Sequence, residues 1–219
     1  MGMGYALRDG VSFCEVNAQL IFLDTRADRY FCLDALREAE FRALIEKPGH
    51  QAVPPRLQDA GLLIETPGAG HVAACPPAYA QASVFDDTQP LRLDRPLLDA
   101  LVRLALVRRS LRRGGLGRIL HRLRRAKSRL PEFHDSALPE LARLARDFER
   151  TARLVRSHDQ CLSRSIVLTQ IALSRGLAAD LVIGVRLNPF AAHSWVQAGS
   201  HVLNDRMDSV RTYTPVLVL

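Results

Sequence analysis

At 219 residues, with 47% hydrophobic and 24% charged residues, the chain has the composition of one large or two small globular domains, which excludes wholesale disorder. No apolar run approaches the roughly 18 residues of a membrane span, and the N-terminus lacks an export-signal pattern, so we expect a cytoplasmic protein. The 4 cysteines have neither CxxC nor zinc-ligand spacing, which predicts free thiols and no metal. The formal charge of +7 favours an anionic partner.

The N-terminal part of the chain predicts three strands followed by helices. Strand-like runs cover residues 11–16, 19–23 and 29–33. Asn17-Ala18 is a plausible tight turn, and Asp34 can cap the next helix because its carboxylate accepts from the free N–H groups of the first turn. A short helix over residues 55–60 and a last strand at residues 62–64 complete a small winged-helix-like domain.

Phe22-Leu23-Asp24, Tyr30-Phe31-Cys32-Leu33 and the helix after them give this domain a resemblance to a known family. It resembles the PqqD-like peptide-recognition domain of natural-product biosynthesis. The resemblance implies that the third strand is an exposed edge to which a leader peptide adds as another strand. The candidate leader-binding residues are Arg29, Tyr30, Phe31, Cys32 and Leu33. Alternatively, Tyr30 and Phe31 simply belong to a hairpin core.

A segment rich in Pro, Gly and Ala follows, with Thr66-Pro67-Gly68-Ala69-Gly70 near its start and Cys75-Pro76-Pro77-Ala78 in its middle. This composition is typical of a linker. We therefore predict a recognition domain over residues 1–66, a linker over residues 67–90 and a second domain over residues 91–219.

The second domain begins with a basic helical region. Helical apolar spacing covers residues 94–107 (Leu97, Leu98, Leu101, Leu104, Ala105), residues 116–123 after Gly114-Gly115, and residues 138–155. Between Arg103 and Arg129 the chain has many arginines and no Asp or Glu. Three interpretations stay open: a solvated basic face, a docking surface for an acidic protein or peptide, and a nucleic-acid surface. The lack of interleaved aromatic residues disfavours nucleic acid.

Residues 161–175 have the length and apolar content of a mostly buried helix that ends before Gly176. Cys161 would be its first residue, where the positive end of the helix dipole stabilises a thiolate and free N–H groups can stabilise an oxyanion. Cys161 is therefore a candidate nucleophile.

The chain then predicts a buried strand at residues 181–185 and a hairpin formed by residues 193–197 and 201–205. A two-residue Gly-Ser loop would pair His193 with Arg206 and turn Asp205 to the other face. A three-residue loop or a bulge would pair His193 with Asp205. We predict the second register, because only it makes a relay in which Asp205 orients the imidazole that activates Cys161.

Four segments of this region carry a second resemblance. They are Cys161-Leu162-x-Arg164-Ser165, Leu181-Val182-Ile183-Gly184-Val185, Pro189-Phe190-x-Ala192-His193-x-Trp195-Val196 and Val202-Leu203-Asn204-Asp205. They are similar to the transglutaminase-like core of lasso-peptide maturation B proteins, which are leader peptidases. The fold expected is thus α+β: a PqqD-type domain, a helical middle region and a papain- or transglutaminase-like cysteine protease domain.

The resemblance implies specific roles. Cys161 is the nucleophile, His193 the general base and acid, and Asp205 the orienting carboxylate. The partners implied are the leader segment of a precursor peptide and an asparagine-synthetase-like cyclase, while nucleic acid is not expected. No cofactor is expected on this chain, which has no GxxxxGK[ST] loop; ATP belongs to the cyclase. The alternatives are a non-catalytic peptide- or nucleic-acid-binding adaptor and a transglutaminase-like acyltransferase.

Overall fold

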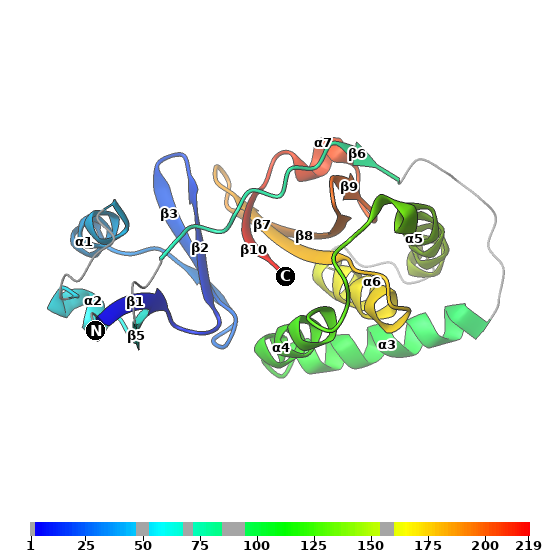
Figure 1. Ribbon diagram of the computed structural model, residues 1–219, viewed down its shortest axis with the longest axis horizontal. Helices are drawn as coiled ribbons and strands as arrows, with labels where there is room; N and C mark the ends of the chain where they lie inside the picture. Colours follow the sequence, from blue (N-terminus) through cyan, green and yellow to red (C-terminus); the bar gives the residue numbers. More distant parts are fainter. Residues whose placement is uncertain (1–2, 47–52, 68–71, 85–94, 154–159) are drawn as a thin grey trace. The chain divides into compact units, whose positions relative to one another are not determined.

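The computed structural model describes residues 3–46, 53–67, 72–84, 95–153 and 160–219 of the chain. The chain is a mixture of helices and strands and divides into two compact units, Met1–Cys75 and Pro76–Leu219 (Figure 1). The division falls inside the segment whose composition predicts a linker. Among the described residues, no helix combines the length and the apolar character that crossing a membrane requires.

In the described part of the first unit, three strands form one antiparallel sheet in the order β2 (Val11–Val16), β3 (Gln19–Asp24) and β4 (Arg29–Phe31). Helices α1 (Ala35–Glu46) and α2 (Pro55–Asp59) follow. These elements lie where the sequence predicts them, except that β4 ends at Phe31 instead of residue 33. The hairpin turn at Asn17 and Ala18 has φ of 50° and 62°, the left-handed pair that matches the twist of two-residue hairpins.

A further strand in this unit, β1 (Met3–Leu7), is absent from the sequence prediction. It pairs with β5 (Leu63–Pro67), the strand expected at residues 62–64. Gly4 and Ala6 have low strand propensity, and the partner strand is distant in the chain, so no local hairpin pattern marks β1.

Phe13, Phe22 and Phe41 form an aromatic cluster within the core of the first unit. Phe13 and Phe22 are stacked at 5.4 Å between ring centroids, and Phe41 of α1 meets Phe13 edge-on at 5.1 Å. Such geometries add to the stabilisation from burial alone. Asp34 accepts a hydrogen bond from the Arg37 N–H at 2.9 Å, which confirms the predicted cap of α1.

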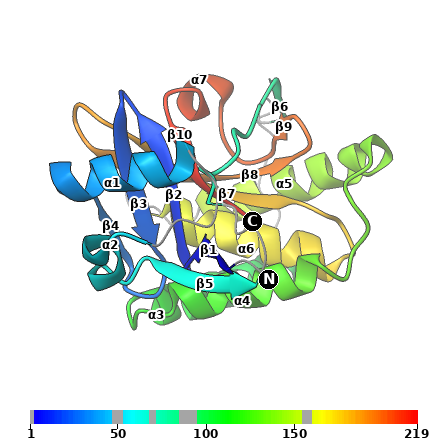
Figure 2. The ribbon, with the colours of Figure 1, turned by 60° about the vertical axis from the view of Figure 1, so that its left-hand side comes forward.

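The described part of the second unit contains a five-stranded sheet in the order β10-β7-β8-β9-β6. Its strands are β6 (Ala82–Ser83), β7 (Asp180–Arg186), β8 (Ala191–Ala198), β9 (His201–Val202) and β10 (Thr214–Val218). Its helices are α3 (Arg95–Leu111), α4 (Leu116–Lys127), η1 (Asp135–Ala137), α5 (Leu138–Arg153), α6 (Cys161–Ser174) and α7 (Met207–Val210). Helix α6 lies between the sheet and helices α3, α4 and α5 (Figure 2).

Strand β6 lies within residues 67–90, which we expected to be a linker. That expectation is wrong for the two residues of β6. It pairs in parallel with β9, and the Val84 N–H donates to the Val202 carbonyl at 3.0 Å. The pairing uses backbone groups that composition does not reveal, and two residues are too few for a periodic pattern.

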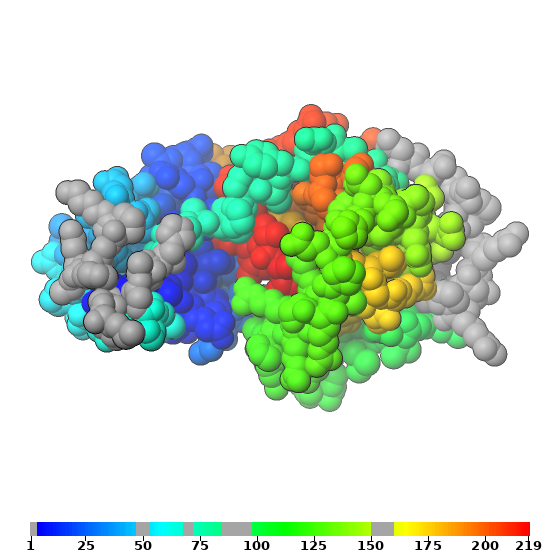
Figure 3. Space-filling view, viewed as in Figure 1, coloured from blue at the N-terminus to red at the C-terminus, as the bar shows by residue number. Residues whose placement is uncertain are grey.

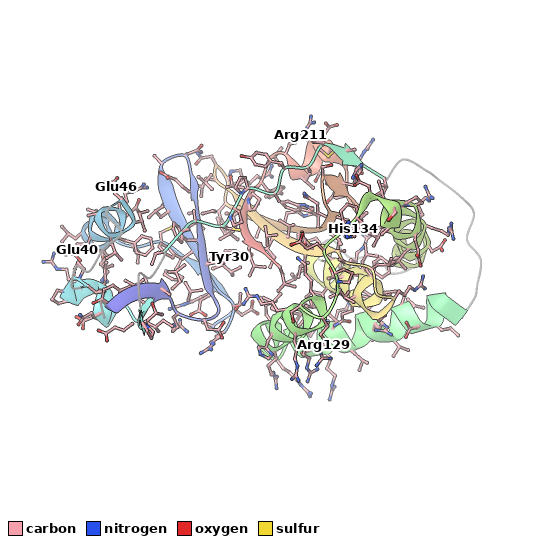
Figure 4. The ribbon with its side chains drawn as sticks, viewed as in Figure 1. Tyr30, Glu40, Glu46, Arg129, His134 and Arg211 are labelled. Carbon is pink, nitrogen blue, oxygen red and sulfur yellow. The ribbon has the colours of Figure 1, made fainter. Side chains whose placement is uncertain are left out.

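Helix α4 buries its apolar face and exposes arginines, whereas α3 buries one apolar row and leaves Leu98, Val102 and Leu106 exposed. Leu116, Ile119, Leu120 and Leu123 of α4 are buried, as expected. In α3, however, Leu98 is 63% exposed and Ala105 is also exposed, so those two residues do not belong to its inner face, which Ala100, Leu104 and Val107 form. Near the labelled Arg129, nitrogen-tipped side chains point away from the ribbon (Figure 4). On the face in Figure 3, α4 and the segment after it stand in front of part of α6.

Candidate active site

Cys161 is the first residue of α6, and Gln160 is its N-cap. The Arg164 N–H donates to the Gln160 carbonyl at 3.0 Å, which closes the first helical turn. The Gln160 side chain makes no capping hydrogen bond, so it does not occupy the N–H groups of that turn. These groups and the helix dipole favour negative charge at the Cys161 sulfur.

The body of α6 is held rigidly beneath the sheet. Ile166, Val167, Leu168 and Ala172 are fully buried, because nearly every face of this helix meets a neighbouring element. A close-packed surrounding fixes the position of the helix start, and therefore of Cys161, against strand β8.

His193 lies on β8, opposite Gly184 of β7. Its ring packs 5.2 Å from the ring of Tyr213 and 6.3 Å from that of Trp195, measured between centroids. Trp195 is almost completely buried and donates from Nε1 to the Gln197 side chain at 3.2 Å. These contacts limit the rotation of the imidazole.

The predicted hairpin register is wrong. Ala198 pairs with His201 and Gln197 with Val202, so the loop consists of Gly199 and Ser200 only. Continued without change, this ladder would place Asp205 on the face opposite to His193. Nevertheless, Nε2 of His193 is hydrogen-bonded to Oδ2 of Asp205.

The side chain of Asn204 resolves this conflict. The Leu203 N–H donates to the Val196 carbonyl at 2.8 Å, as in a regular ladder. In return, the Val196 N–H donates to Oδ1 of Asn204 at 2.7 Å, where a regular ladder would use the Leu203 carbonyl. The chain leaves the ladder at this point, the strand ends, and Asp205 reaches His193 without a longer loop.

Cys161, His193 and Asp205 thus come together from a helix start, a strand and a bend. Because Nε2 of His193 faces Asp205, its Nδ1 is the nitrogen left for the Cys161 thiol, with which the imidazole is hydrogen-bonded. This is the arrangement of a nucleophile, a base and an orienting group.

The pKa values of the two titrating groups move in opposite directions. Burial of the Cys161 thiol opposes its ionisation, but hydrogen bonds with His193 and Ser194 outweigh burial and lower the pKa of Cys161 below its ordinary 9.0. Burial likewise opposes the charged imidazole, yet hydrogen bonds with Asp205 and Cys161 raise the pKa of His193 to about 9. Both shifts therefore favour the pair formed by a Cys161 thiolate and a His193 imidazolium over the pair of neutral groups.

The other described cysteines lack this environment. Cys14 is buried, and its burial, with the nearby Cys75, raises its pKa to about 12. No cluster of three or more His, Cys, Asp or Glu residues that could hold a metal ion exists among the described residues.

Two residues near Cys161, His193 and Asp205 have a structural function that the sequence pattern does not reveal. Arg164, from the Cys-Leu-x-Arg-Ser segment, forms an ion pair with the buried Glu149 of α5 and so fixes the first turn of α6 to its neighbour. Ser165 donates to the Ser194 carbonyl at 3.0 Å and accepts from Nδ2 of Asn204 at 3.0 Å. These contacts join single pairs of residues and follow no periodic pattern, so the sequence does not reveal them. The one signal in the sequence that bears on Asn204 is that a two-residue hairpin loop would turn Asp205 away from His193.

The candidate leader-binding residues lie in the first unit. Within the described residues β4 is an edge strand, since it pairs with β3 alone. Phe31 stacks on Phe22 at 5.2 Å and Arg29 lies over the Phe31 ring at 5.5 Å, so Phe31 contributes to the core as well. Cys32 and Leu33 follow the end of the strand, and Cys32 is exposed.

Comparison with known proteins gives one family and one curated relative. A family model described as the Transglutaminase-like superfamily matches residues 103–218, which include all three clustered residues. The Microcin J25-processing protein McjB of Escherichia coli is 53% identical over 45 residues, or 20% of this chain and 22% of that protein. The chain thus matches less than a quarter of the length of that relative. No solved structure matches.

Proposed function

Because the chain belongs to the transglutaminase-like superfamily, we propose that it is a cysteine peptidase that removes the leader from a lasso-peptide precursor. The observation that carries this proposal is the contact of Cys161 with His193, whose other nitrogen is bonded to Asp205. The similarity to a Microcin J25-processing protein supports the choice of substrate.

The chemistry follows from the polarity of the site. The Cys161 thiolate attacks the carbonyl carbon of the last leader residue, and the N–H groups at the start of α6 stabilise the oxyanion. The His193 imidazolium gives its proton to the leaving amine, which frees the α-amine of the core peptide. Water, deprotonated by His193, then hydrolyses the thioester and restores the thiolate.

The first unit would select the substrate. In our proposal it is a PqqD-like domain whose β4 edge, Arg29–Phe31 with Cys32 and Leu33 after it, accepts the leader as an added strand. A separate asparagine-synthetase-like cyclase would then use ATP to join the freed amine to an acidic side chain. The whole process would take place in the cytoplasm.

The test is mass spectrometry of the precursor peptide incubated with the protein. Native protein should release leader and core with a free carboxylate at the leader end, and Cys161→Ala should release neither while still binding the leader. Cys14→Ser, at a buried thiol outside the site, serves as the control that should retain cleavage. Unchanged cleavage by Cys161→Ala would reject the peptidase in favour of an adaptor or a contaminating activity.

An acyltransferase is the second candidate, because a superfamily member with the same thioester could pass its acyl group to an amine. Adding a primary amine at millimolar concentration separates the two. A peptidase yields the free acid of the leader, whereas a transferase yields the leader amide as the main product.

A further inference from the structure

The three clustered residues each have a neighbour in a second hydrogen-bonded group. Asn204 precedes Asp205, Ser194 follows His193, and Ser165 lies one helical turn after Cys161. Oδ1 of Asn204 accepts from the Val196 N–H at 2.7 Å, and Nδ2 donates to Oγ of Ser165 at 3.0 Å. Oγ of Ser165 then donates to the Ser194 carbonyl at 3.0 Å.

The direction of this chain of hydrogen bonds is fixed at both ends. A backbone N–H can only donate, so the Asn204 atom that meets Val196 is the carbonyl oxygen and its amide nitrogen faces Ser165. A backbone carbonyl can only accept, so the Ser165 hydroxyl donates to Ser194 and is left to accept from Asn204. The donor and acceptor roles of the Asn204 amide and the Ser165 hydroxyl are therefore fixed.

Two members of the group are shielded from water, and Asn204 is half-buried. Ser165 is 0% exposed and Ser194 is 3% exposed. Unpaired polar groups at such positions are costly, so the set is kept together as a unit. It joins helix α6, strand β8 and the bend at residues 203–205 at one point.

Resting on the proposed function, we propose that Asn204 and Ser165 are positioning residues that set the distance between the Cys161 sulfur and the His193 imidazole and place Asp205 behind it. We call the set formed by Asn204, Ser165, the Val196 N–H and the Ser194 carbonyl the Asn204 clasp. The clasp touches none of the reacting atoms. It substitutes for the backbone pairing that would have carried Asp205 to the opposite face.

The experiment compares Ser165→Ala, Asn204→Ala and the double variant with Thr169→Val. Thr169 is the matched control: it is on the same helix and 0% exposed, and its hydroxyl donates at 2.9 Å only to the Ser165 carbonyl within α6. Thr169→Val therefore loses a buried hydrogen bond without affecting any link between α6, β8 and the bend.

Two readouts are needed. The first is the rate at which iodoacetamide alkylates Cys161 as a function of pH, followed by peptide mass spectrometry, which requires no substrate. The second is kcat and KM for precursor cleavage. A displacement of about 1 Å at a reacting group costs on the order of a hundredfold in rate.

We expect Ser165→Ala and Asn204→Ala to lower kcat about a hundredfold, with KM within about twofold, and to shift the alkylation midpoint of Cys161 to higher pH. The double variant should lose no more kcat than the more severely affected single variant, because the clasp acts as a unit. Thr169→Val should behave like the native protein.

An alkylation profile of Ser165→Ala identical to that of Thr169→Val would overturn the proposal. Should Asn204→Ala fail to fold, Ser165→Ala decides alone, because it keeps the bond between Asn204 and Val196. If the clasp variants shift alkylation while native protein leaves the precursor intact, the clasp stands and the leader-peptidase proposal falls.

Discussion

Gly184 lies opposite His193 in the ladder of β7 and β8, and an added Cβ there would lie 2.9 Å from the Trp195 ring and 2.9 Å from Cβ of Tyr213. Real Cβ atoms do not approach other atoms so closely, and both rings also pack against the imidazole. The absence of a side chain at Gly184 therefore leaves the space that Trp195 and Tyr213 occupy when they pack against the ring of His193.

Gly184→Ala should displace Trp195 or Tyr213 and, through them, His193. We expect the free energy of unfolding to fall by about 1–3 kcal/mol from overpacking and kcat to fall about tenfold or more from misplacement of the imidazole. Ile183→Val, the adjacent residue of β7, should cost about 1 kcal/mol without changing kcat. Denaturant unfolding measures the free energy of unfolding, and precursor cleavage measures kcat. Equal kcat in the two variants would contradict the role given to Gly184.

Asp205→Asn should change the pH dependence of cleavage. The His193 pKa of about 9 lies above its ordinary 6.5, so in native protein the imidazolium persists to pH 9 and cleavage should fall above it. Its contribution to stability has the same sign: present in full below pH 6.5, it is lost as pH rises through about 9. Without the carboxylate charge, the pKa of His193 falls and the alkaline limb moves to lower pH.

The measurement is a pH–rate profile for Asp205→Asn beside Asp208→Asn, a change at an exposed aspartate three positions later. Asp205→Asn should also lose about a hundredfold or more in kcat, since an orienting carboxylate fixes the tautomer. Asp208→Asn should retain the native profile. An alkaline limb that stays near pH 9 in Asp205→Asn would show that another group sets the imidazole pKa.

Arg164→Ala should destabilise the second unit more than the loss of an ion pair at the surface. Removing Arg164 leaves the buried Glu149 carboxylate without this partner, and we expect a loss of about 2 kcal/mol, discounted from a fully buried pair because the Arg164 side chain is 32% exposed. Arg103→Ala breaks the exposed pair with Asp99 and should cost about 0.3–0.5 kcal/mol. Thermal unfolding of both variants tests the difference; equal losses would contradict it.

Phe31→Asp should weaken leader binding if β4 is the docking edge. Because Phe31 also stacks on Phe22, the substitution weakens the core, and Phe41→Leu provides a control that weakens the same aromatic cluster from α1. Fluorescence anisotropy of a labelled leader should show about tenfold weaker binding for Phe31→Asp, as for the loss of a central contact. Phe41→Leu should bind normally, and alkylation of Cys161 should be native in both.

Local patterns predicted the local features. The turn at Asn17-Ala18, the Asp34 cap and the placement of Cys161 at the start of a buried helix follow from residue types within a few positions of one another. Strand β1 depends on a partner more than fifty residues away, and β6 on one more than a hundred away, so neither leaves a periodic trace.

The meeting of His193 and Asp205 shows a different limit. Counting residues around the hairpin assumes that every ladder position is filled by backbone, and under that assumption the contact requires an odd number of loop residues or a bulge. A side-chain amide can take the place of a carbonyl, as Asn204 does for Val196, and the parity argument then no longer applies. The contact was expected for a chemical reason, and the structure reaches it by another route.

Strand β6 also bears on where the second unit can be cut from the chain. Oγ of Ser83 donates to the carbonyl of Asp205 at 2.6 Å, and the Gln81 N–H donates to the Ser200 carbonyl at 2.8 Å. A truncated protein that begins at residue 91, where composition alone suggests the boundary, would lose these bonds and expose one side of β9. A truncated protein of residues 76–219 keeps them, and is the fragment in which the thiol should retain its native reactivity.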